Sequence, residues 1–111
     1  MAIIETVRAS VEAYVDQDRD AAGRLLADDY VFTSPQDDHI GKAEFLERCF
    51  PTADRFMSMT ILELAGAGDE GVFLLYEYEL TTGQWFRNAE YSTVRNGQIT
   101  ETQVFFGGRA R

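Results

Sequence analysis

Residues 72–106 constrain the fold of this chain most. They hold long runs of aromatic and β-branched residues on both sides of Asn96-Gly97. Asn-Gly is a strong signal for a β-hairpin, because both central residues of a tight hairpin turn need positive φ. A second turn is expected to close at Thr82-Gly83. The stretch is therefore predicted to be a three-stranded antiparallel meander, and the residues before it must cover one of its faces.

The residues before the meander predict helices and further strands. Apolar residues recur at helical spacing in three segments, residues 2–16, 19–27 and 42–50. Strands are expected over residues 30–33 and 56–65. Residues 34–41 are interpreted as a loop, because Pro35 cannot donate in a strand ladder. This order predicts a single α+β domain over residues 1–111, with three N-terminal helices packed on a curved antiparallel sheet.

The composition argues against several classes of function. A net charge of −9 repels phosphate backbones and anionic lipid, so neither nucleic acid nor a membrane is expected as a partner. The only cysteine, Cys49, cannot form an internal disulfide, and no Cys/His spacing indicates zinc, so neither a metal nor another cofactor is expected. The chain shows no signal-peptide pattern and no apolar run of membrane-spanning length, which predicts a cytoplasmic protein.

Four short segments resemble the SnoaL-like branch of the nuclear transport factor 2-like (NTF2-like) superfamily. They are residues 26–32, residues 34–42 with Ser34-Pro35 and Ile40-Gly41-Lys42, Ala89-Glu90, and residues 94–99. The resemblance covers essentially the whole chain and implies a cone, in which a bent sheet wraps the helices around a deep, mostly apolar pocket. Such proteins include ketosteroid isomerase, limonene epoxide hydrolase, polyketide cyclases and non-catalytic adaptors. The resemblance therefore implies a fold and leaves the function open.

The resemblance also suggests which face of the meander lines the pocket. Strand alternation, with Leu80 opposite Trp85, separates two sets of side chains. The sets are Phe73, Leu75, Glu77, Phe86, Asn88 and Glu90 on one face, and Val72, Leu74, Tyr76, Tyr78, Trp85, Arg87, Ala89 and Tyr91 on the other. Both faces are partly apolar, so alternation alone does not choose between them. Glu90 falls near the strand position of a pocket carboxylic acid in ketosteroid isomerase, which implies that Phe86, Asn88, Glu90 and Glu77 face inward. Tyr76, Tyr78, Trp85 and Tyr91 would then form a homodimer surface.

The register of the last strand is left open. The same comparison implies that Thr102, Val104 and Phe106 face inward. A strict two-residue Asn-Gly turn would instead pair Glu90 with Gln103, so the two expectations agree only if a bulge intervenes.

The chain departs from the catalytic patterns of two known relatives. Ser10 and Ser34 stand where the isomerase has its oxyanion-stabilising Tyr and its general-base Asp. Val104 stands where the limonene-type hydrolase has the last-strand member of its Asp-Arg-Asp arrangement. Serine lacks the pKa of a carboxylate base and valine cannot accept a proton, so neither mechanism is supported.

Three polar side chains are predicted to be catalytic. Glu90 and Glu77 could form a carboxylate pair, whose burial and like charge would raise one pKa toward neutrality, as suits a general acid or base. The alternative is that Glu90 bonds buried backbone or Tyr hydroxyls, while Glu77 lies at a wet rim. His39, in Asp37-Asp38-His39, could shuttle protons at the pocket mouth, or be a solvated loop histidine.

Ten side chains are predicted to contact a ligand. They are Tyr14, Tyr30, Phe32, Phe45, Cys49, Phe86, Asn88, Thr102, Val104 and Phe106. For Tyr14, Tyr30 and Phe32, simple packing in the core is the alternative. Cys49 lies on an apolar helix face and is interpreted as buried and inert.

Three functions fit these features. The first is an isomerase, lyase or hydrolase that acts on an apolar small molecule with Glu90 as acid or base. The second is a protein that binds such a molecule without turnover. The third is an interaction module that uses the aromatic sheet face.

Overall fold

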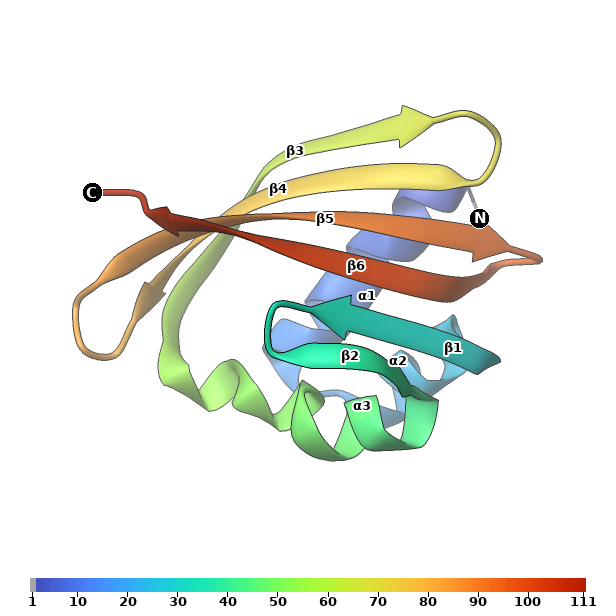
Figure 1. Ribbon diagram of the computed structural model, residues 1–111, viewed down its shortest axis with the longest axis horizontal. Helices are drawn as coiled ribbons and strands as arrows, with labels where there is room; N and C mark the ends of the chain where they lie inside the picture. The colour runs from blue at the N-terminus through green and yellow to red at the C-terminus, as the bar shows by residue number, and fades with distance from the viewer. Residues whose placement is uncertain (1) are drawn as a thin grey trace.

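Six strands form one bent, mixed sheet in the computed structural model, which describes residues 2–111 (Figure 1). The strands are β1 (Leu26–Ser34), β2 (Asp37–Gly41), β3 (Phe56–Ala67), β4 (Gly71–Leu80), β5 (Trp85–Arg95) and β6 (Gln98–Arg109), in the order β2-β1-β6-β5-β4-β3. The predicted meander is confirmed as β4, β5 and β6. The prediction of a purely antiparallel sheet is wrong for one pair of strands, because β1 pairs with β6 in parallel. Side-chain alternation has the same period in both pairings, so it does not reveal strand direction.

The helices lie on the concave side of this sheet (Figure 1). They are α1 (Ile3–Asp16), α2 (Arg19–Leu25), α3 (Lys42–Arg48) and a 3-10 helix, η1 (Phe50–Arg55). All three predicted α-helices are present. The third ends at Arg48, because Pro51 occupies the first turn of η1. No helix among residues 2–111 is both long enough and apolar enough to span a membrane.

Residues 34–41 are a hairpin and not the predicted loop. Ser34 pairs with Asp37, so Pro35 and Gln36 alone form the turn, and Phe32 pairs with Ile40 beyond a shift in register. The Oγ of Ser34 accepts a hydrogen bond from the Gln36 amide at 3.1 Å, which closes the turn. Proline therefore occupies a turn position where no ladder bond is needed.

The β4–β5 hairpin is shifted by one residue from the predicted register. The amide of Gly83 donates to the Leu80 carbonyl at 2.8 Å, and the Leu80 amide donates to the Gln84 carbonyl at 2.9 Å. The loop therefore has three residues, with Gly83 at φ +89°. Glu79 consequently pairs with Trp85.

A shift of one residue turns every side chain of β4 to the opposite face. Leu74, Tyr76 and Tyr78 line the concave side of the sheet, and Glu77 lies on the convex side. The prediction that Glu77 faces inward is therefore wrong. The prediction that Tyr76 and Tyr78 form a dimer surface is wrong for the same reason.

The β5–β6 hairpin contains the bulge that the sequence required. Asn96 and Gly97 both have positive φ, 52° and 77°. Arg95 pairs with Gln98 in the strict register, but the pairing shifts next to Val94, so that Glu90 pairs with Val104. The extra residue brings Thr102, Val104 and Phe106 to the cavity, as the resemblance implied.

The apolar core fills the end of the molecule where β5 and β6 meet their turn. Val72, Val94 and Ile99 are almost fully buried there against Val7 of α1 and Leu26 of β1. At the other end of the sheet, the interior between the strands and the helices is hollow.

Candidate functional site

A cavity of about 640 Å³ lies between the concave face of the sheet and α1, α3 and η1. All ten side chains predicted to contact a ligand line it: Tyr14, Tyr30, Phe32, Phe45, Cys49, Phe86, Asn88, Thr102, Val104 and Phe106. Aromatic rings make up much of the wall, for example Phe32 against Phe45 at 4.8 Å between centroids and Tyr78 against Phe86 at 5.8 Å. Whether these residues bind a ligand stays a prediction.

Sequence reasoning missed a further group of cavity residues. It includes Tyr76 and Tyr78 on β4, Ser34 and Asp37 on the β1–β2 hairpin, and Thr52 on η1. The two tyrosines were missed through the register shift, which a three-residue loop ending in Gly83 would have revealed. Asp37 was missed because its segment was interpreted as a loop.

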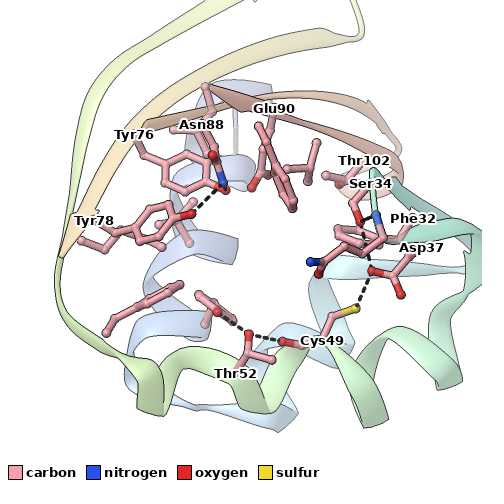
Figure 2. Close-up of a pocket in the computed structure, with 18 of the residues that line it drawn as sticks. Phe32, Ser34, Asp37, Cys49, Thr52, Tyr76, Tyr78, Asn88, Glu90 and Thr102 are labelled. Carbon is pink, nitrogen blue, oxygen red and sulfur yellow. Dashed lines mark hydrogen bonds between the residues drawn. The ribbon is translucent and has the colours of Figure 1, made fainter. Parts of the chain in front are cut away.

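Glu90 lies in the cavity wall between apolar neighbours (Figure 2). Its partners across the sheet are Leu74 on β4 and Val104 on β6. Burial raises the pKa of Glu90 from its ordinary value of 4.5 to about 7, and contact with the Tyr76 hydroxyl opposes part of that rise. The carboxyl group is therefore half protonated close to neutral pH and can act as acid or base.

Asn88 lies two residues before Glu90 on β5, on the same face of the sheet. Its side-chain amide fixes the direction of two hydroxyl groups. Its Oδ1 accepts from the Gly107 amide at 3.4 Å, which can only donate, so Nδ2 must face the tyrosines. Nδ2 donates to the Tyr76 hydroxyl at 3.2 Å and to the Tyr78 hydroxyl at 3.4 Å (Figure 2). Both phenol oxygens are acceptors in these bonds, so each O–H is free to donate elsewhere. Tyr76 contacts Glu90, whereas the O–H of Tyr78 has no acceptor among residues 2–111 and is available to a ligand.

Tyr14 uses its hydroxyl group within the protein. Thr52 Oγ1 donates to the Cys49 carbonyl at 2.7 Å, so the bond of 2.7 Å between the Tyr14 hydroxyl and Thr52 Oγ1 has Tyr14 as its donor. Burial raises the pKa of Tyr14 to about 12, although the hydrogen bond to Thr52 opposes the rise. Tyr14 therefore presents its neutral ring to the cavity and joins α1 to η1.

The structure does not bring Glu77 or His39 to the cavity. Glu77 accepts from Arg87 at 2.6 Å and from Arg111 at 2.9 Å, and these two guanidinium groups, Arg87 first, hold its pKa below the ordinary value. His39 is exposed on β2 and contacts the neighbouring Asp38 at 2.6 Å. The predicted carboxylate pair of Glu90 and Glu77 is therefore wrong, and His39 has the position of a solvated histidine.

Cys49 lies at the C-terminal end of α3 and lines the cavity. Its Sγ is 3.8 Å from the Asp37 carboxylate. Burial, with the negative charge of Asp37 next in size, raises the pKa of this thiol to about 11. The group is thus a neutral thiol near pH 7, which agrees with its interpretation as inert. Within residues 2–111, no three His, Cys, Asp or Glu side chains are grouped closely enough to hold a metal ion.

Comparison with known proteins identifies the family and the fold. The model of the SnoaL-like domain matches residues 7–102. No curated protein matches the chain. Three of the solved structures that resemble it are informative. An NTF2-like protein of unknown function from Cytophaga hutchinsonii is 19% identical, with a TM-score of 0.75 over 96% of this chain and 90% of that one.

The other two structures have more specific descriptions. An LEH-like epoxide hydrolase from M. tuberculosis is 23% identical, with a TM-score of 0.78 over 94% of this chain and 77% of that one. A hypothetical protein with a ketosteroid isomerase-like fold from Catenulispora acidiphila, in complex with trimethylamine, is 21% identical, with a TM-score of 0.71 over 91% and 84%. At these identities the likeness shows the fold alone, and the predicted NTF2-like fold is confirmed.

Proposed function

This chain belongs to the SnoaL-like domain family, and we propose that its cavity binds a small, mostly apolar molecule and transfers a proton to or from it through Glu90. The reaction would be an isomerisation, an elimination or the addition of water. One observation carries the proposal, namely a carboxyl group in the wall of a cavity of about 640 Å³ with its pKa raised to about 7. A group that titrates near the working pH is the most effective acid or base.

Tyr78 supports the same proposal. Its free O–H would donate to an oxygen of the ligand, such as a carbonyl or an ether, while Glu90 exchanges the proton. A donor aimed at an oxygen on which negative charge develops lowers the barrier in a site that excludes water. The expected ligand thus has a ring-sized apolar body and one oxygen acceptor.

The epoxide hydrolase of M. tuberculosis and the trimethylamine complex of the C. acidiphila protein show that neighbours of this fold take small molecules. For this chain, Val104 faces Glu90 from β6. A reaction here would therefore use Glu90 without a carboxylate at the Val104 position.

Binding without turnover is the second function that an observation favours. The groups paired with Glu90 across the sheet are Leu74 and Val104, neither of which can share in proton transfer. Glu90 would then serve only as a hydrogen-bonding group for the ligand.

We also propose a homodimer through the convex face of the sheet. The residues of this interface are those that the observed strand register places on that face. Phe73 and Phe105 are 51% and 55% exposed there. Phe73 contacts Tyr91 at 4.7 Å between ring centroids, and Ala89 lies between Phe105 and Leu75. Exposed apolar side chains grouped in this way are typical of interaction surfaces. Phe105→Lys should give monomers in sedimentation, whereas an unchanged mass would exclude this face.

The experiment on the cavity uses 2-naphthol, a planar apolar molecule with one oxygen, as its probe. Tyr78→Phe should weaken its binding about tenfold, because a hydrogen bond to the probe is lost. Glu63→Gln, on the exposed side of β3, is the matched control and should leave the affinity unchanged. Absence of binding to the unmodified protein would contradict the proposal.

Turnover is tested separately, by incubating a panel of cyclic ketones and epoxides with the protein and analysing products by mass spectrometry. If Glu90 is the acid or base, Glu90→Gln should lower any observed rate at least about a hundredfold. A rate that Glu90→Gln leaves unchanged would remove Glu90 from the reaction, and binding without any turnover would favour the second function.

A further inference from the structure

One row of side chains crosses the concave face of the sheet and includes two carboxylates. Ser34 on β1 pairs with Asp37 on β2, and Val104 on β6 pairs with Glu90 on β5. Since Thr33 pairs with Gln103 in parallel, Ser34 and Val104 are the next neighbours along β1 and β6. All four side chains line the cavity. Asp37 and Glu90 are thus three strand spacings apart, about 14 Å between their backbones along the sheet.

Apolar side chains line much of the cavity between these two carboxylates. Val104 forms its floor, and Phe32 and Phe45 contact each other at 4.8 Å between centroids beside it. Figure 2 shows Asp37, Ser34 and Cys49 on one side of the cavity, and Tyr76 and Tyr78 on the other. A molecule that fills the cavity would meet Glu90 and Tyr78 at one end and Asp37 at the other.

Asp37 is held in a fixed position. Its side chain is only 13% exposed. The Ser34 hydroxyl donates to Oδ2 at 3.0 Å, and the Cys49 thiol lies 3.8 Å from the same oxygen. Ser34 is itself fixed by the Gln36 amide, 3.1 Å from its Oγ. Such support keeps the carboxylate in place before a ligand arrives, which lowers the entropic cost of binding.

The other oxygen of Asp37 has spare capacity. Among residues 2–111, its one charged or hydrogen-bonding partner is Arg48, at 3.4 Å from Oδ1, which is longer than a strong hydrogen bond. Arg48 also pairs with Glu44 through its other terminal nitrogen. One guanidinium group therefore serves two carboxylates, and the group of three carries one net negative charge. Arg55, the other cation that lines the cavity, is exposed on η1.

We propose that Asp37 is a second anchoring group of this cavity, and that the ligand carries a protonated amine at the end opposite to its oxygen. A cation fits the one net negative charge of the group formed by Asp37, Glu44 and Arg48, and its N–H groups fit the remaining acceptor positions of Oδ1. The expected ligand class is therefore an apolar body with an oxygen acceptor at one end and an ammonium group at the other. This inference rests on the proposed binding function and adds the second end of the ligand.

The test compares two probes that differ only at the far end, 2-naphthol and 6-(aminomethyl)-2-naphthol. The second is an ammonium ion at neutral pH. Their dissociation constants for the full chain are measured by titration calorimetry at neutral pH and low salt. We expect the ammonium probe to bind at least about tenfold more tightly, since charge-assisted hydrogen bonds are stronger than neutral ones. The preference should shrink as salt is added, because part of it is electrostatic.

Asp37→Asn keeps the shape of the side chain and removes its charge, so it should abolish the preference for the ammonium probe. Asp38→Asn removes one charge from the adjacent, exposed position and is the matched control. It should leave the preference intact.

The outcomes distinguish a failure of this inference from a failure of the proposed function. Equal affinities for the two probes in the unmodified protein would overturn the role of Asp37, even if no variant of Asp37 folds. A preference that survives in Asp37→Asn, or that Asp38→Asn removes equally, would overturn it as well. If neither probe binds, the proposed function fails and this inference fails with it.

Discussion

Glu90 and Glu77 lie on adjacent strands of one sheet and have opposite environments. Glu90 on β5 faces the cavity between Leu74 and Val104, where burial raises its pKa to about 7. Glu77 on β4 faces the convex side and contacts Arg87 and Arg111, which lower its pKa. The face of the strand, and not the residue type, therefore decides whether a glutamate can exchange protons near neutral pH.

Glu90→Gln should change the pH dependence of the protein's stability more than Glu77→Gln or Gly83→Ala does. Because the pKa of Glu90 is raised from 4.5 to about 7 in the folded protein, the folded state binds more protons than the unfolded chain across that window. Stability contributed by this group therefore falls as the pH rises through the window. The variant escapes the penalty and should be more stable than the parent by about 3 kcal/mol at pH 8, with little difference at pH 4.

Chemical denaturation at the two pH values measures this difference. Glu63→Gln, at an exposed position of β3, is the control and should show the same small effect at both. A stabilisation by Glu90→Gln that does not depend on pH would contradict the raised pKa.

Glu77→Gln should have a smaller effect with the opposite sign. The lowered pKa of Glu77 means that its ion pairs with Arg87 and Arg111 stabilise the protein above the ordinary pKa of a glutamate. This contribution is lost as the pH falls through the folded-state pKa. The variant should therefore melt below the parent at neutral pH and approach it in acid. Equal melting temperatures across the whole range would show that the ion pairs contribute nothing.

Most of the secondary structure and the inward direction of Glu90 could be predicted from the sequence. The face of the sheet on which Glu77 lies could not. The meander, the helices and the inward direction of Glu90 followed from alternation and from the resemblance. The face of Glu77 depended on whether the turn before Trp85 holds two or three residues, and both lengths suit a Thr-Thr-Gly-Gln segment. The bulge near Val94 could be inferred only from a conflict between two expectations. The strict Asn-Gly turn paired Glu90 with Gln103, whereas the resemblance placed Val104 on the inward face. The parallel pairing of β1 with β6 left no signal in either strand.

Gly83→Ala tests the turn that sets the faces of β4, with the smallest expected effect. A Cβ at Gly83 would meet no atom within 4 Å, so its cost is that of the backbone at φ +89°. The variant should lose about 1 kcal/mol of stability. Gly23→Ala in α2 also has free space and an ordinary φ, and should gain a similar amount. Equal effects of the two substitutions would contradict the positive φ at Gly83.

The titration of the glutamate carboxyl carbons, followed by NMR on the full chain, tests the central contrast most directly. We predict that the Glu90 signal titrates near pH 7 and the Glu77 signal below the ordinary value of 4.5. A Glu90 signal that titrates at the ordinary value of 4.5 would contradict the account, because a carboxyl group with that pKa is not buried in an apolar cavity.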